Sequence, residues 1–176
     1  MSKIVPAILA LNVADLKQKL AEIPSEIDLV HIDVLEVDIW TRIKIGFEAH
    51  LMVKEPEKII DRWVKRGAKR IIAHKFIEIK GTEFGLALKL SDPIENLDKA
   101  DFAHLMSIDE IGEQGHPFNP KVFDRIREVR EKFPEIPISV DGGVSLENYQ
   151  RLIDLGVDRL IVGSGFKELW NSLTKK

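Results

Sequence analysis

Short apolar runs alternate along this chain with longer stretches whose apolar residues recur every three or four positions. The first pattern is typical of buried parallel strands and the second of amphipathic helices. Eight parallel strands that alternate with helices predict a (β/α)8 barrel, the TIM fold. We find eight strand-like runs, at residues 4–9, 27–35, 47–53, 70–76, 84–90, 102–107, 136–140 and 160–162.

Helical spacing predicts helices in most of the segments between these runs. Asn12 is a typical N-cap, and Asp92 precedes Glu95 by three residues, which is the spacing of a capping box. Gly67 and Gly156 mark expected helix ends. The expected helices begin after Asn12, after Pro56, at Asp92-Pro93, at Asn119-Pro120, near Leu146 and near Phe166.

Two connections do not fit a complete barrel. Residues 36–46 show no helical spacing, and residues 77–83 are fewer than the dozen that a crossover between parallel strands usually needs. The chain has 176 residues, fewer than the roughly 200 or more of typical barrels. We therefore expect an α/β fold, a TIM (β/α)8 barrel whose helices after the second and fourth strands are missing or reduced to loops. We expect residues 1–176 to form one domain; an open doubly wound sheet would need fewer strands and longer crossovers.

Composition limits the classes of function. The net charge of −3 argues against general affinity for nucleic acid or for an anionic membrane, and no apolar run is long enough to span a bilayer. Cysteine is absent, which excludes disulfides, thiolate metal sites and a cysteine nucleophile. The first residues lack the apolar core of a signal peptide, so we expect a cytoplasmic protein.

Histidines and aspartates stand at the ends of three of the expected strands. His31 and Asp33 are two residues apart, so both point to the same face of their strand. His50 follows on the next strand and Asp141 on a strand far downstream. Two imidazoles and two carboxylates suit a divalent ion, zinc first, with manganese or iron as alternatives.

The other histidines have simpler interpretations. A single buried histidine such as His31 is more often satisfied by hydrogen bonds than by a metal, and only the group of four favours the metal. His74 also ends a strand, and we expect it to line the site or to support the structure. No role is assigned to His104 or His116.

Motifs in nearly the whole chain resemble, in order, those of the ribulose-phosphate 3-epimerase family. As a set they are specific, although Asp-Gly-Gly and Gly-Ser alone occur in many phosphate-binding barrels. The matching motifs are Pro6-Ala7-Ile8-Leu9, His31-Ile32-Asp33-Val34-Leu35-Glu36, His50-Leu51-Met52, Phe84-Gly85-Leu86-Ala87-Leu88, Leu105-Met106-Ser107, Val140-Asp141-Gly142-Gly143-Val144 and Gly163-Ser164.

The resemblance implies one divalent metal ion and a pair of acid/base carboxylates. Asp33 and Asp141 match the catalytic pair, which would remove a proton from one face of the substrate and return one to the other. The implied metal ligands are His31, Asp33, His50 and Asp141. The implied substrate-binding residues are Met52 and Met106, which line the site, and Gly142, Gly143, Gly163 and Ser164, which form a phosphate cradle. Without the resemblance, the methionines would be interpreted as ordinary core packing, and Gly142-Gly143 is also compatible with a simple tight turn after a strand.

The chain departs from the family around the substrate. Ala7 stands where the family has serine, residues 36–40 replace a family segment, and residues 109–115 replace a glycine-rich lid. Glu113 in that lid would place negative charge near a phosphate. Because two covering helices are absent, we also expect a homo-oligomer in which a second copy covers the strands near residues 36–46 and 77–83.

The sequence thus predicts a metal-dependent isomerase (EC 5.1.3.-) acting on a small sugar phosphate. The expected reaction interconverts D-ribulose 5-phosphate and D-xylulose 5-phosphate at C3, by two-aspartate proton transfer through an enediolate. Two alternatives stay open. One is the same chemistry on another ketose phosphate, such as a hexulose 6-phosphate. The other is a non-catalytic relative that binds a phosphorylated ligand or a partner protein.

Overall fold

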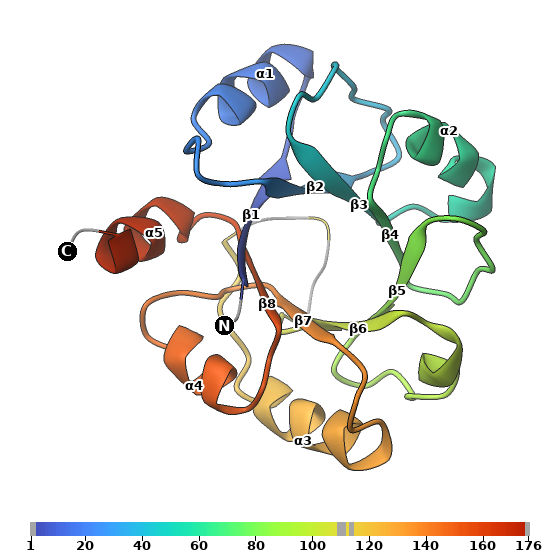
Figure 1. The fold of residues 1–176 in the computed structure, drawn as a ribbon, viewed down its shortest axis with the longest axis vertical. Helices are drawn as coiled ribbons and strands as arrows, with labels where there is room; N and C mark the ends of the chain where they lie inside the picture. Colours follow the sequence, from blue (N-terminus) through green and yellow to red (C-terminus); the bar gives the residue numbers. More distant parts are fainter. Residues whose placement is uncertain (1–2, 109–111, 113–114, 175–176) are drawn as a thin grey trace.

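In a computed structural model, eight parallel strands pair in chain order and close into a barrel, which confirms the predicted TIM fold. The structure describes residues 3–108, 112 and 115–174. The strands form a central ring with the helices outside it (Figure 1). The strands are β1 (Lys3–Leu9), β2 (Leu29–Val34), β3 (Gly46–Leu51), β4 (Arg70–Ala73), β5 (Glu83–Leu88), β6 (Phe102–Met106), β7 (Ile138–Asp141) and β8 (Arg159–Val162).

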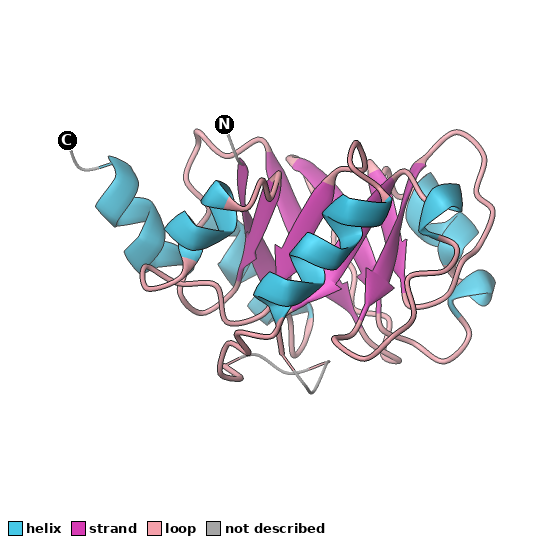
Figure 2. Ribbon diagram, turned by 90° about the horizontal axis from the view of Figure 1, so that it is seen from below, coloured by secondary structure: helices cyan, strands magenta, loops and turns pink. Residues whose placement is uncertain are grey.

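Five α-helices and two short 3-10 turns surround this ring in the described part of the chain (Figure 2). As predicted, the connections from β2 to β3 and from β4 to β5 contain no helix. The Asn12 side chain accepts a hydrogen bond from the backbone N–H of Asp15, so the predicted N-cap is confirmed. The helical elements are α1 (Val13–Ala21), η1 (Pro56–Lys58), α2 (Ile60–Lys65), η2 (Leu97–Lys99), α3 (Val122–Lys132), α4 (Tyr149–Asp154) and α5 (Phe166–Thr174).

The helix predicted to begin at Asp92-Pro93 is wrong. The Asp92 carboxylate accepts a hydrogen bond from the backbone N–H of Lys89, which precedes it, and so closes a turn instead of capping a helix. Asn96 then adopts a left-handed backbone with φ of 67°, which a continuing helix does not allow. Only the 3-10 turn η2 remains between β5 and β6.

The loops that replace helices cover the barrel with their own side chains. Trp40 packs edge-on against Trp63 of α2, with ring centroids 5.4 Å apart. The Arg66 guanidinium lies over Trp40, 4.7 Å from the ring centroid, and donates two hydrogen bonds to Asp38. Of the large apolar residues in the two loops, Val37 is exposed, whereas the described isoleucines pack partly buried against the core. The expected bare strand faces are therefore absent from the described structure, and the homo-oligomer stays a prediction without that support.

Strand register brings the predicted site residues to one end of the barrel. Asp33 is level with His50 on the neighbouring strand, and Met106 is level with Asp141. Because all strands are parallel, their carboxyl ends lie at the same rim, where the active sites of TIM barrels are found. No helix in the described part of the chain is long and apolar enough to cross a bilayer.

Candidate active site

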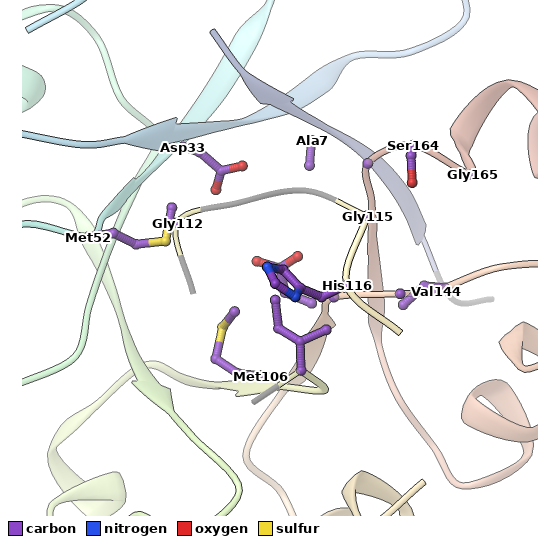
Figure 3. Close-up of a pocket in the computed structure, with 15 residues that line it drawn as sticks. Ala7, Asp33, Met52, Met106, Gly112, Gly115, His116, Val144, Ser164 and Gly165 are labelled. Carbon is purple, nitrogen blue, oxygen red and sulfur yellow. The ribbon is translucent and has the colours of Figure 1, made fainter. Parts of the chain in front are cut away.

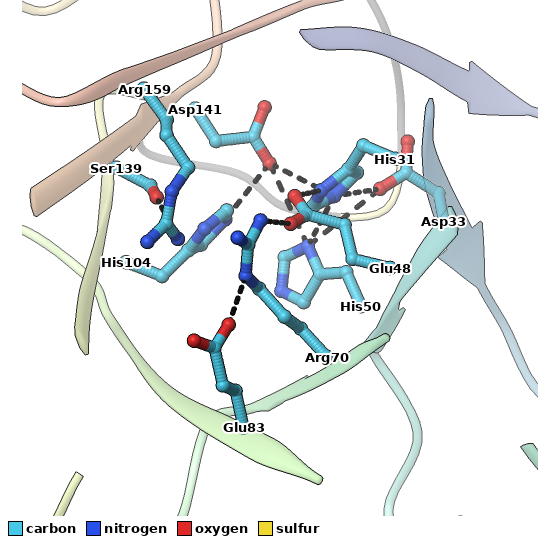
Figure 4. A network of polar contacts seen from close by, with 10 residues as sticks. All are labelled: His31, Asp33, Glu48, His50, Arg70, Glu83, His104, Ser139, Asp141 and Arg159. Carbon is cyan, nitrogen blue, oxygen red and sulfur yellow. Dashed lines mark hydrogen bonds and ion pairs between the residues drawn. The ribbon is translucent and has the colours of Figure 1, made fainter. Parts of the chain in front are cut away.

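The four predicted metal ligands converge inside the barrel near the carboxyl ends of β2, β3 and β7 (Figure 4). The Nε2 atom of His31 lies 3.3 Å from Asp33 Oδ1 and 3.7 Å from Asp141 Oδ2. The Nδ1 atom of His50 lies 3.7 Å from Asp33 Oδ1 and 3.6 Å from Asp141 Oδ2. The two imidazole nitrogens are 3.4 Å apart.

These separations suit a metal ion. Zinc bonds of about 2.0–2.2 Å place tetrahedral ligand atoms about 3.3–3.6 Å apart. Each measured pair falls within or close to that range, and the two nitrogens and two oxygens are ligand types that zinc accepts. The donor set is also sheltered from water, because both histidines are fully buried and the two aspartate side chains are almost buried.

Glu48 holds the first of these histidines in place. His31 Nδ1 and Glu48 Oε1 are 2.8 Å apart, and both side chains are fully buried. The other carboxylate oxygen of Glu48 accepts a hydrogen bond of 3.3 Å from Arg70, which also pairs with Glu83. A carboxylate on one ring nitrogen leaves the other nitrogen free to face the site. Glu48 was not among the predicted site residues, although it stands two residues before His50 and therefore points to the same face of β3.

Charge pairing shifts the pKa values of the four groups. Burial alone would lower the pKa of His31 and of His50, but their hydrogen bonds to carboxylates raise both, that of His31 well above its usual value. Burial alone would raise the pKa of Asp33 and of Asp141, yet hydrogen bonds from histidines lower both. Without a metal, the protonated imidazoles of His31 and His50 therefore pair with the ionised carboxylates of Asp33 and Asp141. A metal ion that binds there has to displace protons from the imidazoles.

Two further histidines lie beside this group. The Nε2 atoms of His74 and His50 are 3.0 Å apart, so His74 contacts a predicted ligand, and it is not among the residues that line the pocket described below. His104, to which the sequence analysis gave no role, is fully buried with Nε2 at 3.2 Å from Asp141 Oδ2. Burial and nearby positive charge lower the pKa of His74 to about 3, and burial lowers that of His104 to about 4. The sequence does contain one indication for His104: it stands two residues before Met106 on the same strand, so both side chains point to the same face.

A pocket opens from the two aspartates to the glycine turns after β7 and β8 (Figure 3). Every residue predicted to contact substrate lines it, and so does Ala7. His116, on the loop after β6, also lines it; the sequence alone offered no partner that would single it out. Glu113 and most of the altered lid lie outside the described residues. The six residues predicted to bind substrate that line this pocket are Met52, Met106, Gly142, Gly143, Gly163 and Ser164.

Glycine is required at both turn positions after β7. Gly142 has φ of 108°, and a Cβ there would lie 2.7 Å from the Ile108 side chain. Gly143 has φ of 61°, and a Cβ there would lie 2.7 Å from the backbone nitrogen of Phe118. Gly142 and Gly143 therefore form a tight turn and also line the pocket, so the two interpretations of this motif are compatible.

The fold and the site together define a TIM-barrel protein with a metal-competent histidine–carboxylate cluster at the carboxyl ends of its strands. The model of the Ribulose-phosphate 3 epimerase family matches residues 3–167. The chain belongs to this family and is therefore an isomerase, as the resemblance of its motifs predicted.

Several relatives carry the name ribulose-phosphate 3-epimerase. The one from Schizosaccharomyces pombe is 29% identical over 196 residues, covering 93% of this chain and 86% of its own. The one from Escherichia coli K12 is 29% identical over 196 residues, covering 92% and 87%. The one from Bacillus subtilis is 27% identical over 199 residues, covering 93% and 91%.

Solved structures show the same fold at lower identity. The 3-hexulose-6-phosphate synthase of Salmonella typhimurium matches with a TM-score of 0.65 at 14% identity, over 94% of this chain and 90% of that one. A Pyrococcus furiosus tryptophan synthase structure matches with a TM-score of 0.62 at 14% identity, over 98% and 90%. At such identities the likeness supports the barrel fold alone.

Proposed function

We propose that the protein is a metal-dependent epimerase that interconverts D-ribulose 5-phosphate and D-xylulose 5-phosphate at C3. The observation that carries the proposal is the convergence of two imidazoles and two carboxylates at separations of 3.3–3.7 Å, with both carboxylates lining the pocket that the glycine turns shape. Membership of the epimerase family and the names of the relatives support the same reaction.

In this proposal Asp33 and Asp141 carry the protons. They come from β2 and β7 and both line the pocket, so a bound ketose can lie between them. One carboxylate takes the proton from C3 on one face, and the other, as a carboxylic acid, returns a proton to the opposite face. The roles exchange in the reverse direction. One proton must therefore be held by the pair, which should titrate as a coupled unit.

The metal site of the proposal consists of His31, Asp33, His50 and Asp141. A divalent ion bound there, zinc first and manganese or iron as alternatives, would supply positive charge that stabilises the negative charge developing on the substrate oxygens. The two imidazoles must be neutral to bind it. Glu48 supports this role, because its hydrogen bond to His31 keeps that ring oriented.

The phosphate group of the substrate would lie at the turns after β7 and β8. Backbone N–H groups of Gly142, Gly143, Gly163 and Ser164 are the proposed donors, and the absence of side chains on the glycines permits close approach. Met52 and Met106 would form apolar walls beside the sugar carbons. All six residues line the same pocket as the two aspartates, which supports this orientation.

A coupled assay for xylulose 5-phosphate tests the proposal. Zinc-loaded protein should convert ribulose 5-phosphate, and Asp33→Asn and Asp141→Asn should each lose about a hundred- to ten-thousandfold in kcat, which is the usual size of general acid–base contributions. Asp154→Asn, on α4 away from the pocket, is the matched control and should keep full activity. Absence of turnover by the zinc-, manganese- and iron-loaded protein would contradict the proposal.

A second candidate is the same chemistry on another ketose phosphate, such as a hexulose 6-phosphate. It is favoured by Ala7, which lines the pocket without a hydroxyl to contact the substrate. A panel of ketose phosphates compared by kcat/KM separates the two. A non-catalytic role is disfavoured, because binding alone does not require a buried pair of acid/base carboxylates. Cytoplasmic location and a single domain over residues 1–176 remain predictions; a homo-oligomer, also untested, would show as a dimer or larger species in sedimentation.

A further inference from the structure

We infer that His104 is an additional ligand of the proposed metal ion, which makes the site one of three imidazoles and two carboxylates. The inference rests on the proposed metal-dependent function. It concerns a residue outside the four ligands that the resemblance implies, and it changes which ions the site should prefer.

The position of the His104 ring carries the inference. His104 lies on β6, fully buried, with Nε2 at 3.2 Å from Asp141 Oδ2. That same oxygen faces His31 Nε2 at 3.7 Å and His50 Nδ1 at 3.6 Å. One ligand atom from each of these four residues lies within 4.8 Å of all the others. Metal bonds of about 2.1 Å place opposite ligands about 4.2 Å apart, so small side-chain rotations bring the four atoms to one ion.

The surroundings of the ring direct its Nε2 atom towards the proposed metal ligands. The ring stacks on His31, with an interplanar angle of 7° and centroids 5.4 Å apart, and meets His50 edge-on at 4.8 Å. Its Nδ1 atom is buried and has no hydrogen-bond partner among the described residues. Nε2 is therefore the only ring nitrogen of His104 with a polar neighbour among the described residues, and that neighbour is the proposed metal ligand Asp141.

His104 and Asp33 complement each other as donors. Asp33 Oδ1 faces His31 and His50 but does not belong to the group of four that includes His104. An ion that contacts His104 together with His31, Asp33, His50 and Asp141 would have five protein ligands. Three nitrogen donors favour ions late in the first transition series, so the site should prefer zinc or cobalt over manganese.

X-ray absorption at the zinc edge counts imidazole ligands directly. We expect three imidazoles in the zinc-loaded wild type and two in His104→Gln. Glutamine keeps an N–H donor that can reach Asp141 but supplies no imidazole, so it separates ligation from hydrogen bonding. His104→Gln should also bind zinc at least about tenfold more weakly, measured by competition with a chelator.

His74→Gln is the matched control. His74 contacts the Nε2 atom of His50, on the side of that ring away from the donor group, so its loss should leave the count at three. Circular dichroism checks that each variant is folded; if His104→Gln does not fold, the wild-type count decides alone.

The outcomes separate this inference from the proposed function. Two imidazoles in the wild type, or three in His104→Gln, would overturn the role of His104 even if the protein epimerises ribulose 5-phosphate. Three imidazoles in a protein without epimerase activity would support the role of His104 and contradict the proposed function. A protein that binds no zinc, cobalt or manganese overturns the inference together with the metal part of the proposed function.

Discussion

Replacement of Glu48 by glutamine tests the buried pair beneath the site. Glu48 is fully buried, bonds to His31 at 2.8 Å and accepts a hydrogen bond from Arg70. Burial alone would raise the pKa of Glu48, but the hydrogen bond and positive charge of His31 lower it from the usual 4.5 to about 2. That difference corresponds to about 3 kcal/mol of folding free energy at a pH where the carboxylate is charged in both states.

The pH dependence has a definite sign. Because the folded-state pKa of Glu48 is low, its contribution is complete above pH 4.5 and is lost as the pH falls towards 2. The pKa of His31 is raised, so its contribution is complete below pH 6.5 and is lost as the pH rises through the folded-state value. Both contributions are present together near pH 5.5. Metal-free Glu48→Gln should therefore lose about 3 kcal/mol at pH 5.5 and about half as much at pH 3.

Urea unfolding of the metal-free protein, followed by circular dichroism, measures these differences. Glu83→Gln is the matched control, because Glu83 pairs with the same Arg70 but its side chain is 54% exposed. That control should lose less than about 1 kcal/mol. A loss in Glu48→Gln no greater than in Glu83→Gln, or one that grows as the pH falls from 5.5 to 3, would refute the argument.

Three further predictions follow from the pocket. Gly143→Ala should raise KM for ribulose 5-phosphate and lose at least about 1 kcal/mol in urea unfolding, because its φ is 61° and its Cβ would meet Phe118; unchanged values would contradict this. Ala7→Ser should lower KM for ribulose 5-phosphate about two- to tenfold, because the added hydroxyl can form one hydrogen bond to the substrate; an unchanged or higher KM would contradict this. Comparison with the unphosphorylated ketose shows whether that hydrogen bond involves the phosphate group. Removal of metal by chelation should abolish turnover, and added zinc should restore it; full activity of metal-free protein would rule out the metal.

The barrel could be predicted because each strand is a separate apolar run with its own flanking helix or loop. The same local signals failed between β5 and β6, where Asp92 and Glu95 have the spacing of a capping box. There the Asp92 side chain bonds backwards to Lys89, and the left-handed Asn96 prevents helix propagation. A capping pattern establishes that a turn can form, but it does not establish which backbone N–H the side chain will choose.

The four donors at strand ends were predictable because the ends of parallel strands share one rim. Glu48 and His104 were not predicted. Like His31 they lie within strands that are buried on both faces, but they stand just before the matching motifs His50-Leu51-Met52 and Leu105-Met106-Ser107 and not inside them. In such strands an apolar alternation is missing, and the inward-facing positions become known only when the register does. Once Met106 is known to face the pocket, alternation places His104 on the same face.

The loops around the barrel were the least predictable part. Absence of a helix after β2 suggested an exposed strand surface, but Trp40 and its neighbours fill that space. Irregular segments have no periodicity from which burial can be inferred, so their packing emerges only in three dimensions.

Deuterium exchange at C3 tests the two-carboxylate mechanism most directly. In D2O, the zinc-loaded wild type should incorporate deuterium at C3 of both ribulose 5-phosphate and xylulose 5-phosphate. Asp33→Asn and Asp141→Asn, with metal content verified, should each exchange only the epimer whose C3 proton faces the remaining carboxylate, and the two variants should act on opposite epimers. Exchange of the same epimer by both variants, or no exchange by the wild type, would contradict the account.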